Sequence, residues 1–319
     1  MIGLLIPYAF GQLTFSHILG TEGNGTLQFK KPAGIAVDNK EGKIYVAEFE
    51  NKRIQVLEFS GNFDSFIYLE GKAHGVEIEG DRIYVAIWSD ESHVDIFNKN
   101  GTRLSSISGF ESPGDIAINN SGKIFVTDYG TGEIKIFNPY GDLLKTLTIP
   151  PTSNNIDAKP TGIALDVFGD IYVADYLNDR VMKMNSSGNF LFELIVPDVE
   201  GGKFSKPTNL EINSKGDIFV TDRHRVLVFN SNGDFLYTFG ELGKDAAQFS
   251  GPHGIAFDNS GNIYVAEYDN HRIQVFNTLD SSQIHQNITE QKEIREVDVS
   301  KSISWFDSII NYIKSIFNW

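Results

Sequence analysis

Two histidines and two glutamates are the residues of this chain with the most specific chemical potential. His74 and His253 occupy equivalent places in an internal repeat, and Glu77 and Glu211 share a second equivalent place three residues farther along. A neutral imidazole can bind a transition metal or orient a ligand, and carboxylates bind divalent cations. The pattern predicts a site for a divalent metal or a polar ligand, with hydrogen-bonded structural side chains as the alternative.

The other copies of the repeat carry different residues at these two places. The histidine position holds Ala33, Gly114, Thr161 and Thr208, and the glutamate position holds Ala36, Ala117, Ala164 and Ala256. Functional residues tend to occur where a repeat breaks its own rule, and burying a bare carboxylate is costly. We expect Glu77 and Glu211 to line one channel from opposite sides, facing water or a cation.

A third equivalent place is almost entirely aromatic. Directly after the second strand of each copy stand Phe49, Trp88, Tyr129, Tyr176, Arg223 and Tyr268. Aromatic residues and arginine dominate binding hot spots. A ring of them predicts a ligand-binding rim, with packing between neighbouring units as the alternative.

Other recurrent charges are expected to be structural. An acidic residue ends the second strand in five copies, and an arginine opens the next strand in four of these. The two residues are three to five positions apart around one turn, so they can bridge the hairpin. The acids are Glu48, Asp128, Asp175, Asp222 and Glu267, and the arginines are Arg53, Arg180, Arg225 and Arg272.

All these positions belong to a segment that recurs six times. In its clearest copy, Phe249 to Asn277, three short apolar segments are separated by turn-forming residues, which is typical of an antiparallel meander. A fourth strand follows each of the first five copies. Four strands per unit of about 40 to 47 residues are typical of propeller blades. The copies start at Pro32, Ala73, Pro113, Pro160, Pro207 and Pro252.

The N-terminal segment supplies the strand that the sixth copy lacks. Residues 13–29 match residues 235–249 in register, with Leu19 and Gly20 aligned on Phe239 and Gly240. We expect this strand to complete the last blade and to remove exposed sheet edges. The fold class is therefore all-β, a six-bladed β-propeller closed by the N-terminal strand, with a C-terminal amphipathic helix.

The motifs Pro-x-Gly-Ile-Ala-x-Asp, Ile-Tyr-Val-Ala-Asp/Glu and Asn-x-Arg-Ile-x-Val-Phe resemble the NHL repeat, most closely in blades one, four and six. The resemblance covers roughly residues 12 to 277 and implies a propeller. NHL-like propellers serve as protein-binding, RNA-binding or sensor modules. In the peptidyl-α-hydroxyglycine α-amidating lyase that the fold resembles, histidines at the Pro-His position of alternate blades bind zinc. Here blade four has Thr161 at that position, so the three-histidine set is incomplete.

Composition bounds the partners and the compartment. The 319 residues carry a formal net charge of -15, which disfavours nucleic acid as a partner. There is no cysteine, so disulfides and thiolate sites are excluded. Residues 1–11 look like part of a secretion signal, with an apolar first strand as the alternative. Five glycosylation sequons suit an exported glycoprotein, at Asn24, Asn100, Asn119, Asn185 and Asn287.

The C-terminal region lies outside the repeats. Residues 278–301 are polar and read as a linker, whereas residues 302–319 have apolar residues at helical spacing. Such a helix would dock on the propeller, on a membrane surface or on a partner. The sequence as a whole predicts a non-enzymatic, exported scaffold. Its NHL-repeat propeller, residues 12–277, would bind protein, peptide or glycan on one rim. The alternative is a metal-dependent lyase or hydrolase at the channel mouth.

Overall fold

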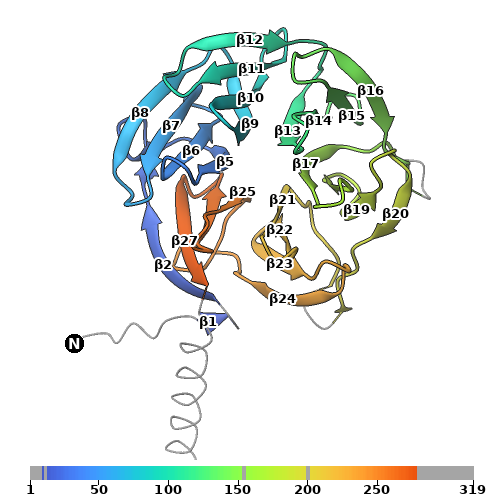
Figure 1. Cartoon of the computed structure of the whole chain (residues 1–319). Coiled ribbons are helices and arrows are strands. Elements are labelled where there is room, and N and C mark those ends of the chain that lie inside the picture. Colours follow the sequence, from blue (N-terminus) through green and yellow to red (C-terminus); the bar gives the residue numbers. More distant parts are fainter. Residues whose placement is uncertain (1–8, 11–12, 153–155, 199–201, 279–319) are drawn as a thin grey trace, which may run out of the picture.

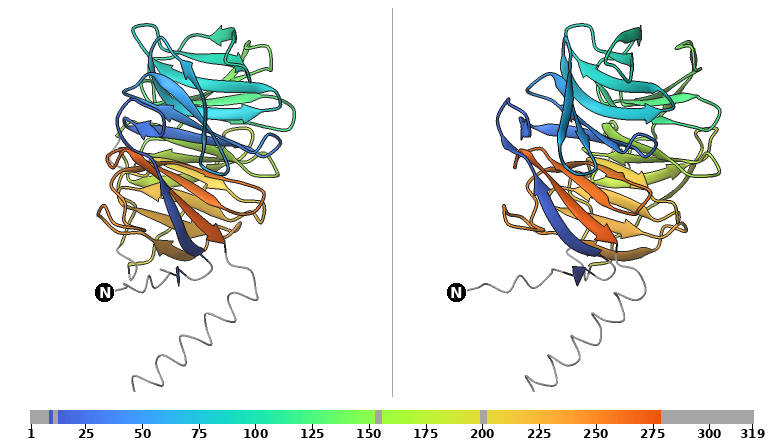
Figure 2. Two further views of the ribbon diagram at one scale, coloured as in Figure 1. Left: turned by 90° about the vertical axis from the view of Figure 1, so that its left-hand side faces the viewer. Right: turned by 60° about the vertical axis from the view of Figure 1, so that its left-hand side comes forward.

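The computed structural model describes residues 9–10, 13–152, 156–198 and 202–278. Within them six antiparallel sheets stand around a central axis as the blades of a propeller (Figure 1). The side views show the disc that the blades form together (Figure 2). No helix in this part of the chain is long and apolar enough to cross a membrane.

Each blade begins with an innermost strand, which contains the anchor residue in five blades and starts two residues after it in the fifth blade. The first three blades are β5 (Pro32–Asp38), β6 (Lys43–Glu48), β7 (Arg53–Glu58) and β8 (Phe63–Tyr68); β9 (Lys72–Glu79), β10 (Arg82–Trp88), β11 (His93–Asn98) and β12 (Arg103–Ile107); and β13 (Pro113–Ile118), β14 (Ile124–Asp128), β15 (Glu133–Phe137) and β16 (Leu143–Thr148). The next two are β17 (Pro160–Leu165), β18 (Ile171–Asp175), β19 (Arg180–Met184) and β20 (Phe190–Glu193); and β21 (Asn209–Ile212), β22 (Ile218–Asp222), β23 (Arg225–Phe229) and β24 (Phe235–Phe239).

The sixth blade joins the two ends of the repeat region. It consists of β25 (Pro252–Phe257), β26 (Ile263–Glu267), β27 (Arg272–Thr278) and β2 (Leu13–Leu19), with β1 (Ala9–Phe10) beyond β2. Strand β2 is antiparallel to β27, with Leu13 opposite Thr278 and Leu19 opposite Ile273. The predicted closure by the N-terminal strand is confirmed.

The connections that follow β2 and β24 repeat each other in detail, as the sequence register predicted. A parallel pair of short strands, β3 (Thr21–Glu22) and β4 (Gln28–Phe29), follows β2, and a parallel bridge between Leu242 and Phe249 follows β24. Gly20 and Gly240 have positive φ angles of 81° and 90°. A Cβ on either glycine would lie within 2.5 Å of the Phe29 or Phe249 ring, so only glycine allows the ring to pack there.

Burial is greatest in the second strands and smallest in the outermost ones. Every residue of β14, β18, β22 and β26 is buried, because both faces of each blade pack against neighbouring blades. In contrast, four of the five residues of β12 are exposed. The core therefore lies between blades, in six clusters of apolar side chains.

Glycine lets the innermost strands approach one another around the axis. A Cβ on Gly34 would lie 2.5 Å from the carbonyl oxygen of His74, and one on Gly254 would lie 2.6 Å from that of Ala33. The same position holds Gly75 and Gly162 in two other blades. The remaining two blades carry Asp115 and Asn209 instead, and both of these side chains line the channel.

The predicted acid and arginine pairs bridge the hairpins in all four blades. The Arg53 Nε lies 2.5 Å from Glu48 Oε1, and the pairs of Arg180, Arg225 and Arg272 lie at 3.0, 3.1 and 2.5 Å. Each guanidinium also donates to backbone carbonyls of the loop that enters its blade, as Arg53 does to Asn24, Gly25 and Gln28. In blade three Lys135 takes the place of the arginine, 2.8 Å from Asp128. The structural interpretation is confirmed.

The propeller ends at Thr278, one residue beyond the predicted boundary. The predicted linker and helix at residues 278–319 otherwise lie outside the described residues, as does most of the predicted signal segment at residues 1–11. Both stay predictions.

Candidate functional site: an aromatic cup at the channel mouth

A cavity of about 580 Å³ opens at one end of the channel. We call it the cup. Two histidines and five of the six predicted rim residues line it together, namely His74, His253, Trp88, Tyr129, Tyr176, Arg223 and Tyr268. The cup therefore gathers side chains from five different blades.

The blade architecture places these side chains on one face. His74 and His253 stand near the starts of β9 and β25, and the rim residues end or directly follow the second strands. In four of these five rim residues the backbone N–H donates to the segment that enters the same blade, as Tyr176 N–H does to Lys159 O at 3.1 Å and Tyr268 N–H to Gly251 O at 2.8 Å. These bonds hold the aromatic rings at the mouth of the channel.

Phe49 is the rim residue that does not line the cup. It is only 9% exposed, and its ring lies 5.6 Å from that of Trp88, 5.9 Å from that of Tyr268 and 6.2 Å from that of His74. At this position the packing alternative holds. Phe49 supports the wall of the cup from behind.

The two histidines contact each other at the base of the aromatic wall. Their ring centroids are 5.0 Å apart with the planes at 76°. The His74 ring also stacks on Trp88 at 5.0 Å, and the His253 ring lies 5.4 Å from Tyr268. Burial lowers the pKa of His74 to about 4 and that of His253 to about 3, so both imidazoles are neutral at pH 7.

A hydrogen bond fixes the tautomer of His74. Its Nδ1 lies 2.9 Å from the carbonyl oxygen of Gly114. A carbonyl only accepts, so Nδ1 carries the proton and Nε2 is left as an acceptor. The cup thus contains an uncharged hydrogen-bond acceptor among aromatic rings.

The two glutamates lie deeper in the channel and do not line the cup. Glu77 and Glu211 face a separate cavity of about 100 Å³, and both also border a cavity at the opposite end of the channel. They come from blades two and five and approach one channel from two sides, as the sequence predicted. Burial, with added repulsion from Glu211 and Asp115, raises the pKa of Glu77 far above its usual value, and burial raises that of Glu211 to about 8.

Asp115 and Asn209 complete this carboxylate cluster, and the sequence reasoning missed them. Asn209 Nδ2 donates to Asp115 Oδ2 at 3.1 Å, and the backbone N–H of Ile163 donates to the same oxygen at 3.3 Å. Burial raises the pKa of Asp115 to about 7. A signal was present, since both residues replace the glycine that the other four blades carry two places after the anchor.

The described side chains that could bind a metal do not gather in one place. Within the described residues no group of three or more histidines, cysteines or acids has the spacing to hold an ion. The histidine pair lines the cup, whereas Glu77 and Glu211 line the cavities farther along the channel. The four predicted metal ligands therefore do not form one set, and a divalent cation in the channel stays a prediction.

A collar of lysines surrounds the cup and was also missed. Four lysines stand immediately before the anchor residues, and each places its ammonium over the aromatic residue of the preceding blade. The nitrogen-to-centroid distances are 4.8 Å for Lys31 over Tyr268, 4.7 Å for Lys72 over Phe49, 5.3 Å for Lys159 over Tyr129 and 5.5 Å for Lys206 over Tyr176. We call these four residues the lysine collar. Their recurrence before the anchors was the signal.

The family model of the NHL repeat matches three segments, residues 29–57, 110–137 and 249–276. These segments lie in blades one, three and six. The other three blades have the same four-stranded antiparallel sheet. The chain is an NHL-repeat β-propeller. The quoted motifs resemble the repeat most closely in blades one, four and six, whereas the family model matches blades one, three and six.

Solved structures similar to this NHL-repeat propeller share its fold at low sequence identity. A structural genomics protein from Bacteroides thetaiotaomicron has a TM-score of 0.69 at 17% identity, over 83% of this chain and 76% of its own. Virginiamycin B lyase from Staphylococcus aureus has a TM-score of 0.60 at 14% identity, over 84% and 100%. A putative gluconolactonase has a TM-score of 0.64 at 14% identity, over 83% and 96%. No curated protein matches the sequence.

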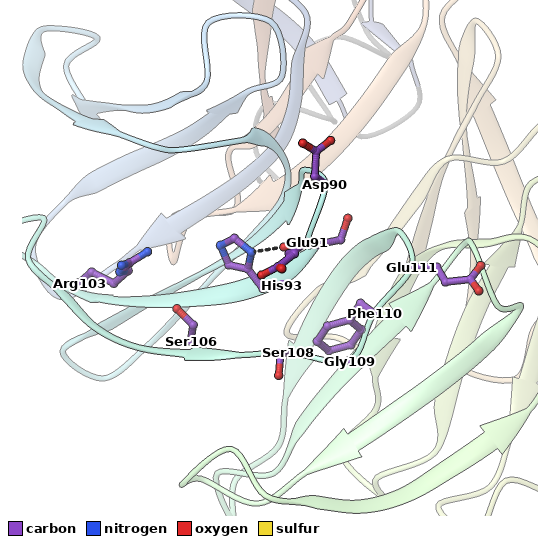
Figure 3. A pocket seen from close by; sticks show the side chains of 10 residues that line it. Asp90, Glu91, His93, Arg103, Ser106, Ser108, Gly109, Phe110 and Glu111 are labelled. Carbon is purple, nitrogen blue, oxygen red and sulfur yellow. Dashed lines mark hydrogen bonds between the residues drawn. The ribbon is translucent and has the colours of Figure 1, made fainter.

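A larger cavity, of about 670 Å³, lies away from the channel in this propeller, between blades two and three. Two of its polar side chains donate hydrogen bonds: His93 Nδ1 donates to the carbonyl of Glu91 at 2.7 Å (Figure 3), and Ser106 Oγ donates to the buried Asp95. Asp90, Glu91 and Glu111 give its lining an acidic character. None of the predicted site residues lines it, and the cup remains the better candidate.

Proposed function

We propose that this NHL-repeat propeller is a non-enzymatic binding module that holds a protein, peptide or glycan group in its aromatic cup. The observation that carries the proposal is the convergence of five rim residues and two neutral histidines on one cavity of about 580 Å³. That volume is in the range of ligand pockets. Aromatic side chains bring large contact area at small entropic cost, so they suit a preformed site.

The two threonine hydroxyls of the cup support binding over catalysis. Thr161 and Thr208 line it, but their hydroxyls donate to the backbone carbonyls of Pro207 and Pro252, at 3.2 and 2.8 Å. Neither hydroxyl is hydrogen-bonded to an imidazole, as an activated nucleophile would be. The neutral imidazoles instead offer fixed, uncharged contacts to a ligand.

The test compares capture by three forms of the protein on arrays of immobilised peptides and oligosaccharides. We expect Tyr176→Ala combined with Tyr268→Ala to weaken the capture seen with the wild type by about ten-fold or more, because both rings are lost from the wall. Tyr140→Ala is the control, since Tyr140 is 89% exposed and is not among the residues that line the cup. Equal capture by all three forms would refute the proposal.

A metal-dependent lyase or hydrolase is the alternative. One observation favours it: two neutral imidazoles, the form that binds metals, line one cavity side by side. The lyase and gluconolactonase similarities lie at 13–14% identity and extend to the fold alone. Elemental analysis of the purified protein tests this alternative. It requires a stoichiometric transition metal in the wild type that is lost in His74→Ala combined with His253→Ala.

We also infer that the protein is exported. Cleavage after Gly11 would leave β2, the closing strand, intact from Leu13 onward. The sequons at Asn24 and Asn100 are exposed, as glycosylation requires. Sequencing of the mature N-terminus tests the inference, and an intact Met1 in protein from the native source would contradict it.

A further inference from the structure

We propose that the cup recognises an acidic peptide, with an aromatic or aliphatic side chain against the rings and a neighbouring carboxylate against Lys206 and Arg223. The inference rests on the proposed function and names the ligand class. It depends on the charges around the cup, which the aromatic pattern alone did not show.

The lysine collar puts positive charge at the mouth of the cup. Acidic residues outnumber basic ones by 42 to 27 in this chain, yet cations cover the rings of Tyr129, Tyr176 and Tyr268. Each ammonium is attracted to the face of its ring. The aromatic wall and the positive charges are therefore parts of one arrangement.

The cations near the cup are not equivalent, and only two of them, Lys206 and Arg223, are among the described residues that line it. Lys72 is paired with Glu50 at 3.4 Å, and Lys159 Nζ donates to Gly130 O at 2.9 Å. Lys206 and Arg223 are exposed and line the cup directly. The acid that lines the cup, Asp269, belongs to blade six. A ligand carboxylate is therefore best placed between Lys206 and Arg223, in blade five.

The same arrangement argues against a cationic ligand. A site for an ammonium group needs open aromatic faces. Here the lysines already occupy faces of three of the rings that line the cup, and a second cation would be repelled by them. The histidines carry no positive charge at neutral pH, so they add no charge to the floor of the cup.

The lining favours a peptide over a glycan or a nucleic acid. Among the described residues that line the cup, two cations, Lys206 and Arg223, stand against one acid, Asp269, and this charge balance favours an anionic peptide over an uncharged glycan. Its volume of about 580 Å³ accommodates one or two side chains. An RNA would require a longer positive track than this one mouth provides.

The experiment measures binding of three capped tripeptide amides by isothermal titration calorimetry. Their sequences are Glu-Phe-Glu, Gln-Phe-Gln and Lys-Phe-Lys, so they differ in charge and share the aromatic group. We expect the acidic peptide to bind about ten-fold more tightly than the neutral one at low salt, and the basic one to bind most weakly. The advantage of the acidic peptide should shrink as salt is added, because salt screens exposed charges.

Two double variants locate the charge effect. Lys206→Gln combined with Arg223→Gln should bring the acidic peptide down to the affinity of the neutral one and leave the neutral one unchanged. Lys123→Gln combined with Arg82→Gln is the matched control, because both residues are exposed and stand at turns between first and second strands, on the other face of the disc. The control should keep the full preference.

The outcomes separate this inference from the proposed function. Equal binding of acidic and neutral peptides, lost in Tyr176→Ala combined with Tyr268→Ala, overturns the inference and supports the proposed function. The inference is also overturned if the protein binds no peptide but captures an oligosaccharide. The same holds if it binds no peptide but captures a single-stranded oligouridine through Lys206 and Arg223. Binding of no peptide and no array ligand at the cup defeats the proposed function itself.

Discussion

At the scale of single residues, the channel contains groups whose protonation differs between the folded and unfolded chain. The lowered pKa values of His74 and His253 mean that the unfolded state takes up protons first as the pH falls below 6.5. Their contribution to stability is therefore complete above pH 6.5 and is lost as the pH falls through about 4 for His74 and about 3 for His253. The raised pKa values of Glu77, Glu211 and Asp115 act in the opposite direction.

Glu211→Gln tests the carboxylate half of this balance. Burial raises the pKa of Glu211 to about 8 from 4.5. Between these values the folded state keeps a proton that the unfolded state releases, so stability falls as the pH rises. The amide cannot ionise, and we expect the variant to be about 2–4 kcal/mol more stable than the wild type at pH 8.5 and nearly equal at pH 4.5.

Urea unfolding at the two pH values measures this difference. Glu58→Gln is the control, because Glu58 is exposed at the outer end of its strand. If Glu211→Gln and wild type lost the same stability between pH 4.5 and 8.5, the buried, protonated state of Glu211 would be wrong.

At the scale of elements, the buried arginine pairs join each hairpin to the loop that enters its blade. Arg272 binds Glu267 and also donates to the carbonyls of Lys244, Asp245 and Gln248. Glu267 is fully buried, with further donors from Asn270 and Gln274. The pair is therefore a structural joint between two connections of the fold.

Arg272→Met should destabilise the protein by about 3–5 kcal/mol, because it leaves the buried Glu267 carboxylate without its cation. Removing both charges, in Glu267→Gln combined with Arg272→Met, should recover part of the loss. Chemical denaturation of the three proteins provides the measurement. Equal destabilisation by the single and double variants would show that the carbonyl contacts of Arg272, not its charge pairing, hold the joint.

At the scale of the whole molecule, the ring is closed by a strand that is distant in sequence from its partner. Strand β2 supplies the fourth strand of the sixth blade, and Phe15 on it lies 5.9 Å from the ring of Phe276. Without β2, the edge of β27 and the apolar side chains behind it would be exposed. Closure thus covers the sheet edge and the apolar side chains behind it.

Removal of residues 1–19 should lower the melting temperature by at least about 10 °C and should produce oligomers through the open edge of β27. Calorimetry and size-exclusion chromatography measure the two effects. Removal of residues 1–8 alone is the control, because β2 is kept. A truncated protein that melts like the wild type and stays monomeric would contradict the role of β2 as the closing strand.

The sequence by itself determined the blades, their number and their closure, because a repeat constrains residues that are neighbours within one unit. The periodic strands, the acid and arginine hairpins and the match of residues 13–29 to 235–249 all have this local origin. The candidate residues were found in the same way, as departures from the repeat at His74, Glu77, Glu211 and His253.

Only the tertiary structure decided how those residues are grouped. It placed the histidines with the aromatic rim and the glutamates with Asp115 and Asn209, and it buried Phe49 behind the wall of the cup. These groupings bring together residues of different blades. Asn209, for example, is hydrogen-bonded to Asp115, which lies 94 positions earlier in the chain. Contacts across a closed ring depend on how all six blades pack around the axis, which no single repeat encodes.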